Sequence, residues 1–283
     1  CSLFINSTFG GTLSGRVNFD GKSPKKRSLK MDADPVCGSS HKGKVFNESF
    51  LVDDKNNLTN VMVWLKDIKY TGKVTAAPAV IDQNGCLYTP HVQGIMKGQE
   101  LLIKNSDATL HNIHSMAKVN DQFNFAMPSV VKEKETVFNS VEEPFFIKCD
   151  VHPWMKSWVL VQDHPFFAVT DENGNFKIEH IPPGTYEVVA WNEYFTTKRV
   201  ITKTIEINDS SETILDFLFI KPDKESCAND LLTFGQLIFN SIFVFSGNIF
   251  IILGISSLSR IPHAKSMNCF FMLTNSSVFI SNL

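Results

Sequence analysis

Three residues with metal-binding side chains lie in one short run, Cys149-Asp-Val-His152-Pro-Trp-Met155. Their spacing of three and three lets one tight loop aim a thiolate, an imidazole and a thioether at one point. Copper that cycles between Cu(I) and Cu(II) favours a thiolate, two imidazoles and a weak axial thioether, because this set suits both oxidation states. The run therefore predicts a copper site for single-electron transfer, with Cys149, His152 and Met155 as ligands.

The second imidazole must come from elsewhere, and the run His111-Asn112-Ile-His114 follows an apolar segment that predicts a strand. On an extended strand His111 and His114 point to opposite faces, so we expect one of them to bind the metal. Pro153 is expected to stiffen the ligand loop. Together with Trp154 it is expected to shield the site from water, which tunes its potential.

Other metal and catalytic sites fit these residues less well. Zinc prefers four strong ligands in a tetrahedron and gains nothing from Met155. A Cys/His hydrolase is a weaker interpretation, because Cys149 and His152 on one loop leave no evident orienting residue or oxyanion hole. A binuclear copper centre needs a second Cys in the loop, and multicopper oxidases need His-Cys-His and His-x-His runs that this sequence lacks. The residues favour a carrier and not an enzyme.

The order of these residues carries a family resemblance. Asn105-Ser-Asp107, then His111-Asn112-Ile-His114, then Cys-x-x-His-x-x-Met resembles the cupredoxins, and the short loop is most similar to that of amicyanin. The resemblance covers about residues 80–162 and implies a Greek-key sandwich with one type 1 copper ion. It also implies that His111 is the ligand, that His114 lies outside the ligand set, and that Asn112 helps tie the two ligand-bearing loops together.

The elements that must position these residues are strands. Short apolar or alternating runs separated by turns, with no amphipathic helix, predict an all-β chain over residues 11–220. Val61–Leu65, for example, is an apolar run that predicts a buried strand. The chain has 283 residues, enough for one or two domains. Its net charge of −2 gives no indication of nucleic-acid binding, which a strongly basic surface would favour.

A second resemblance concerns the segments on either side of the copper region. Gly11–Val17 and Asn60–Leu65, combined with Thr170–Phe176 and Ile181–Tyr186, resemble the carboxypeptidase regulatory-like domain, a transthyretin-like β-sandwich. Its first half precedes the copper region here, and its second half follows it.

We therefore expect a discontinuous sandwich of residues 11–70 and 164–220, with a cupredoxin domain of residues 71–163 inserted in it. Two sequential sandwiches, with 11–70 belonging to the cupredoxin, are the alternative. The arrangement is similar to bacterial periplasmic proteins labelled methylamine-utilisation or plastocyanin-like. That similarity implies electron transfer outside the cytoplasm, with a redox partner such as a c-type cytochrome or a dehydrogenase.

Two further cysteines bear on the compartment. Cys37 and Cys86 lie in similar turn-like contexts and could form a disulfide, which would imply an oxidising compartment. Two free thiols are the alternative, since spacing never fixes connectivity. The first residue, Cys1, is compatible with a lipidated N-terminus or with a truncated reading frame.

Residues 221–283 differ in character from the rest and are expected to form a linker, a membrane segment and an unpatterned tail. Residues 231–259 contain no charged side chain or histidine, so residues 231–258 are a candidate transmembrane helix. Arg260 and Lys265 follow it, which would leave the β region outside the cytoplasm. The alternative is a buried or non-native tail.

Two other functions remain open at this point. One is a binding module whose copper site serves copper handling or sensing. The other is a cupredoxin-like domain that holds no metal. A visible thiolate-to-copper absorption band would separate the metal-free domain from the other two.

Overall fold

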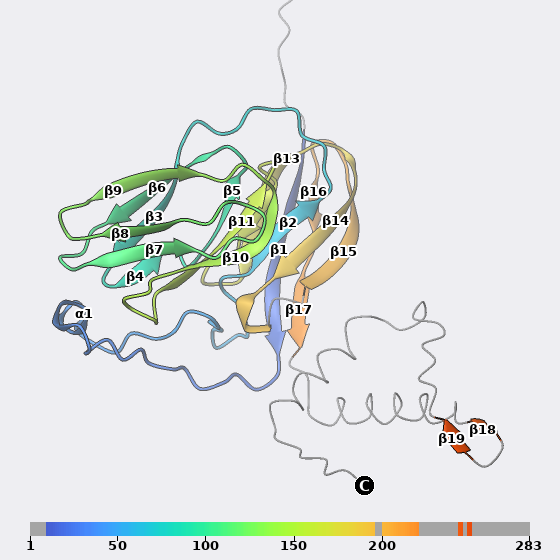
Figure 1. The fold of residues 1–283 in the computed structure, drawn as a ribbon. Coiled ribbons are helices and arrows are strands. Elements are labelled where there is room, and N and C mark those ends of the chain that lie inside the picture. The colour runs from blue at the N-terminus through green and yellow to red at the C-terminus, as the bar shows by residue number, and fades with distance from the viewer. Residues whose placement is uncertain (1–9, 196–199, 221–242, 246–247, 251–283) are drawn as a thin grey trace, which may run out of the picture. The chain divides into compact units, whose positions relative to one another are not determined.

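A computed structural model describes residues 10–195, 200–220, 243–245 and 248–250. Strands and the turns and loops that connect them make up almost all of the described residues, which confirms the expected all-β class. The chain divides into two compact units, residues 1–219 and 220–283, which are described separately. Two β-sandwiches make up the first unit (Figure 1).

The central sandwich consists of β3 to β11 and forms two sheets, ordered β5-β11-β10-β7-β8 and β4-β3-β6-β9. Its strands are β3 (Ala79–Asn84), β4 (Leu87–Thr89), β5 (Val92–Met96), β6 (Glu100–Asn105), β7 (His111–Ser115), β8 (Asn124–Met127), β9 (Glu133–Val137), β10 (Glu142–Lys148) and β11 (Lys156–Gln162). The two sheets enclose one apolar core to which nearly every strand contributes, for example Ile81, Ile103, Ile113 and Val159.

The flanking sandwich uses strands from both sides of the central one in the sequence. Its strands are β1 (Gly11–Asp20), β2 (Met62–Lys66), β12 (Phe167–Val169), β13 (Asn175–Ile181), β14 (Gly184–Trp191), β15 (Val200–Ile207), β16 (Glu212–Ile214) and β17 (Phe217–Ile220), with a 3-10 turn, η1 (Glu193–Phe195), after β14. One sheet has the order β13-β1-β16, with β17 also pairing with β1, and the other has the order β12-β2-β14-β15.

The pairing register links the early strands to the late ones. Leu13 of β1 lies opposite Ile178 of β13, and Val63 of β2 lies opposite Ala190 of β14. The chain thus begins the flanking sandwich, builds the central one, and returns to complete the first.

Two strands are buried on both faces, and this joins the sandwiches. Along β2, Val63 and Leu65 enter the core of the flanking sandwich, whereas Met62 and Trp64 enter a separate apolar layer. On β11, Trp158 and Leu160 enter that same layer from the central sandwich. Successive strand residues point to opposite faces, so a strand with both faces covered becomes a continuous apolar run.

The connection between β1 and β2 leaves the flanking sandwich. It carries the short helix α1 (Pro35–Ser39), drawn in blue at the end of the central sandwich near β4 (Figure 1). A disulfide between Cys37 of α1 and Cys86, in the turn before β4, fixes it there. These are the two cysteines that the sequence offered as a pair.

Beyond Ile220, the second unit is described only as the antiparallel pair β18 (Phe243–Phe245) and β19 (Asn248–Phe250). The candidate membrane helix at 231–258 otherwise lies outside the described residues, as does Cys1. Among the residues that the structure describes, no helix has the length and apolar character needed to cross a bilayer.

Candidate metal centre

The loop between β10 and β11 brings Cys149 and His152 together. The backbone N–H of Met155 donates to the carbonyl of His152 at 2.9 Å, and the N–H of Cys149 donates to the carbonyl of Met155 at 3.2 Å. The N–H of His152 in turn donates to the Cys149 sulfur at 3.3 Å. These bonds close the loop on itself and leave the Cys149 Sγ 3.8 Å from the His152 Nδ1.

His111 reaches the same point from the start of β7. Strand β7 pairs with β10, with Lys148 opposite His114, so the beginning of β7 lies beside the ligand loop. The His111 Nδ1 is 2.9 Å from the His152 Nδ1. One donor atom each from His111, Cys149 and His152 lie within 4.8 Å of one another, and all three residues are buried. Both imidazoles thus present Nδ1 to the thiol.

The turn before His111 is shaped by Asn105. Its amide nitrogen donates to the carbonyls of Thr109 and Met127, at 3.2 and 2.8 Å, and its oxygen accepts from the N–H of Asp107. This places Asp107 where its carboxylate contacts the His111 Nε2 at 2.8 Å. A polar side chain buried at a strand end thereby fixes the orientation of the imidazole.

Asn112 links the two ligand-bearing segments. Its side-chain oxygen accepts from the N–H of Asp150 at 2.6 Å and lies 3.3 Å from the Cys149 sulfur. Its side-chain nitrogen donates to the Asp150 carboxylate at 3.1 Å. A single amide therefore holds β7 against the loop beside the thiol.

The other predicted residues lie on the same loop. Met155 is 1% exposed and belongs to the core of the central sandwich. The Trp154 ring lies 5.1 Å from the His152 ring, and its Nε1 donates to the carbonyl of Cys86 at 3.0 Å. Pro153 is exposed, so the contact that covers His152 on this side comes from Trp154.

The protonation of the site favours the ligand form of the thiol. Burial raises the pKa of Cys149, but hydrogen bonds from His111 and from backbone N–H groups outweigh burial, and the pKa lies below its ordinary value. Burial lowers the pKa of His111, but its bonds to Asp107 and Cys149 raise it to about 9. The thiolate is the form that binds metals, and His111 must release a proton before it binds one.

His114 and His91 lie apart from this cluster. The His114 Nδ1 contacts the Asp150 carboxylate at 2.9 Å, near the surface. The His91 Nε2 contacts the Glu193 carboxylate of η1. Glu193 also accepts from the Trp158 indole at 2.6 Å, so His91 belongs to the junction of the two sandwiches.

Sequence reasoning missed Asp34, which contacts the other imidazole. Its Oδ2 lies 3.1 Å from the His152 Nε2, and its Oδ1 accepts from the N–H groups of Val36 and Cys37 at the start of α1. The sequence indicated this contact only indirectly: a disulfide between Cys37 and Cys86 would bring the segment around Asp34 toward the metal site. Asp107 was part of the recognised pattern but had no role assigned.

Two further groups of metal-binding side chains overlap with this site. They are Asp34, Cys37 and His152, and Cys86, Asp107 and His111. Both depend on sulfurs that are joined in the disulfide, so neither offers a thiolate. Among the described residues, His111, Cys149 and His152 are therefore the group whose donors suit a copper ion.

Several solved structures of copper proteins are similar to part of this chain. A copper-containing nitrite reductase from Thermus scotoductus SA-01 is 16% identical over 34% of this chain and 25% of that chain, with a TM-score of 0.29. An amicyanin variant in the Cu(I) form is 18% identical over 35% of this chain and 98% of that chain, with a TM-score of 0.28. A purple cupredoxin from Nitrosopumilus maritimus is 25% identical over 30% of this chain and 99% of that chain, with a TM-score of 0.26.

These neighbours are cupredoxins matched over about a third of the chain, and the match spans a quarter of the nitrite reductase. A family model described as polysaccharide lyase family 4, domain II, matches residues 145–215. It differs from the carboxypeptidase regulatory-like domain that the sequence predicted. No curated protein matches the chain.

Proposed function

We propose that the chain holds one type 1 copper ion and carries single electrons between redox partners outside the cytoplasm. His111, Cys149 and His152 would bind the ion, with Met155 as a weak fourth ligand. The observation that carries the proposal is the convergence of one donor atom each from His111, Cys149 and His152 within 4.8 Å, with the two Nδ1 atoms 2.9 Å apart. When bound there, copper would supply a one-electron couple, and a His₂Cys set with a weak thioether suits both of its oxidation states.

The residues around the ligands support transfer of electrons more than catalysis. His111, Cys149, His152 and Met155 are each between 0 and 2% exposed. A substrate could not reach an ion held by them without a rearrangement of the loop, whereas an electron needs no such access. We therefore propose a carrier and not an enzyme.

The compartment and the partners belong to the same proposal. The Cys37–Cys86 disulfide supports an oxidising compartment, because disulfides persist outside the cytoplasm and are rare within it. We propose a periplasmic or other extracytoplasmic location, either free or anchored to a membrane. The partner would be a redox protein such as a c-type cytochrome or a dehydrogenase. The flanking sandwich, residues 11–70 and 164–220, would be a carboxypeptidase regulatory-like domain interrupted by a cupredoxin domain of residues 71–163.

Potentiometric titration of the copper-loaded chain, followed at its visible band, tests the function. A carrier should show one reversible one-electron transition and should keep its copper through repeated cycles in the presence of a chelator. His114→Ala should behave as the parent does, because His114 lies outside the donor cluster. Rapid loss of copper to the chelator would instead support copper handling, and the absence of a visible band would support a metal-free domain.

A further inference from the structure

Each of the two imidazoles contacts a carboxylate on the side of the ring opposite the thiol. The His111 Nε2 lies 2.8 Å from Asp107, and the His152 Nε2 lies 3.1 Å from Asp34, while both Nδ1 atoms face the donor cluster. A neutral imidazole carries its proton on one of its two ring nitrogens, and a hydrogen bond from that nitrogen to an acceptor decides which one. A proton held on Nε2 by a carboxylate leaves the lone pair of Nδ1 free for a metal.

The two carboxylates have different origins. Asp107 comes from the central sandwich, four residues before its histidine. Asp34 comes from the connection between β1 and β2, 118 residues before His152. We call residues 31–40, which include Asp34 and α1, the capping segment. Its Asp34 also accepts from the hydroxyl of Thr109 at 2.9 Å, two residues before His111.

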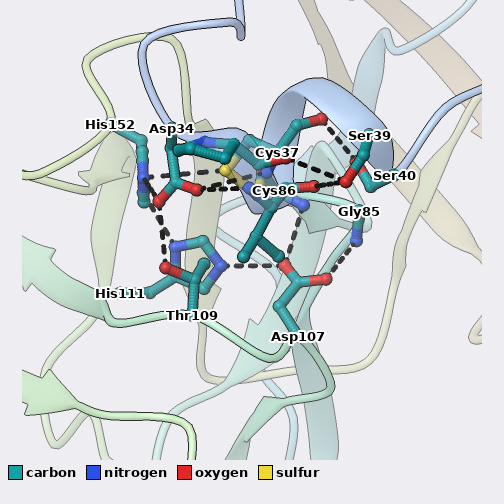
Figure 2. The surroundings of a disulfide bond; sticks show 12 residues. Asp34, Cys37, Ser39, Ser40, Gly85, Cys86, Asp107, Thr109, His111 and His152 are labelled. Atoms are coloured by element: carbon teal, nitrogen blue, oxygen red, sulfur yellow. Dashed lines mark hydrogen bonds and ion pairs between the residues drawn. A yellow bond between two sulfur atoms is a disulfide. The ribbon is translucent and has the colours of Figure 1, made fainter.

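One disulfide anchors both carboxylates. Asp34 binds the backbone N–H of Cys37 at 3.3 Å, and Asp107 binds the backbone N–H of Cys86 at 2.8 Å. Since Cys37 and Cys86 are bonded to each other, a continuous path runs from one imidazole to the other through the disulfide (Figure 2). The path lies outside the donor cluster and contacts both imidazoles on their Nε2 side.

We propose that Asp34 is a positioning residue for His152, as Asp107 is for His111, and that the Cys37–Cys86 disulfide holds it in place. This inference rests on the proposed copper site. It assigns to the capping segment a role in setting the geometry and the retention of the metal. The flanking sandwich, from which the segment extends, thereby contributes to a centre whose ligands all belong to the central one.

The test compares four forms of the full chain, each loaded with one equivalent of Cu(II). They are the parent, Asp34→Ala, Asp34→Asn, and Asp32→Ala, a control at an exposed position of the same segment. We expect Asp34→Ala to alter the EPR and visible spectra and to lose copper to a chelator about 10- to 100-fold faster, as outer-shell changes do. Asp34→Asn keeps an acceptor oxygen and the cap of α1, so it should recover most of the parent spectrum. Asp32→Ala should match the parent.

The role of the disulfide is tested by combining its removal with the substitution of Asp34. Cys37→Ser with Cys86→Ser should change the spectra in the same direction as Asp34→Ala, and adding Asp34→Ala to the serine pair should change them little further. Fully additive effects would overturn the link between the disulfide and Asp34. A parent-like spectrum and copper loss in Asp34→Ala would overturn the positioning role while leaving the proposed function intact. A parent without a visible band would overturn both.

Discussion

The Nδ1 atoms of His111 and His152 lie 2.9 Å apart although 41 residues separate them in the chain. Neither nitrogen is directed at a carboxylate, since Asp107 and Asp34 occupy the Nε2 positions. Below pH 9 His111 carries a proton in the metal-free chain, and a metal cation bound by both nitrogens would displace it.

Replacing the proposed axial ligand should shift the potential without removing the colour. In Met155→Leu the thiolate and both imidazoles remain, so the visible band should persist. Loss of a donor disfavours Cu(II) more than Cu(I), so the reduction potential should rise. For a one-electron couple about 59 mV corresponds to a tenfold change in the equilibrium constant, and we expect at least that shift. Potentiometry checks it, and an unchanged potential would count against Met155 as a ligand.

Copper affinity should depend on pH through His111. Its pKa is raised to about 9 in the metal-free chain, so below pH 9 its proton must leave when copper binds. The apparent affinity should therefore rise by about tenfold for each pH unit up to pH 9, and less steeply above. Competition with a chelator of known pH dependence measures this. An affinity that is constant between pH 6 and 8 would contradict the release of a proton from His111 when copper binds.

Removing the disulfide should destabilise the metal-free fold. Cys37 and Cys86 are separated by 49 residues in sequence, and a cross-link over such a loop reduces the entropy of the unfolded chain. Replacing both with Ser should lower the free energy of unfolding by about 2–4 kcal/mol. Denaturant unfolding of the metal-free parent and variant gives the difference, and equal midpoints with equal slopes would refute the prediction.

Glu193 should matter for the junction of the sandwiches more than for the metal site. Its buried carboxylate contacts His91, Trp158 and Lys156, and although burial raises its pKa, the bond to His91 brings the net pKa below its ordinary value. Glu193→Ala leaves these partners uncompensated and should cost about 3 kcal/mol of unfolding free energy at neutral pH.

The same pKa direction sets how that contribution depends on pH. A carboxyl group with a lowered pKa stabilises the fold above its unfolded pKa and loses this effect as the pH falls through its folded pKa. The difference between the parent and Glu193→Ala should therefore shrink in acid. Glu187→Ala, at an exposed ion pair with Lys66, should cost less than about 1 kcal/mol. Similar losses in both variants would contradict the role given to Glu193.

The all-β class and the short ligand loop could be predicted because their signals are local. The spacing of Cys149, His152 and Met155 lies within seven residues, and the apolar run that became β2 reflects burial of both its faces. Asp34 could not be predicted in the same way, because its contact with His152 spans 118 residues and depends on how the β1–β2 connection folds back. The contact between His91 and Glu193 could not be predicted for the same reason, since it forms only where the two sandwiches meet.

In the proposed function, Cys149 binds copper as a thiolate together with His111 and His152. The visible absorption spectrum of the full chain with one equivalent of Cu(II), recorded beside that of Cys149→Ser, is the decisive measurement of this binding. We predict an intense thiolate-to-copper charge-transfer band in the parent and its loss in the variant. A colourless parent, or a band that persists in Cys149→Ser, would contradict copper binding by the Cys149 thiolate.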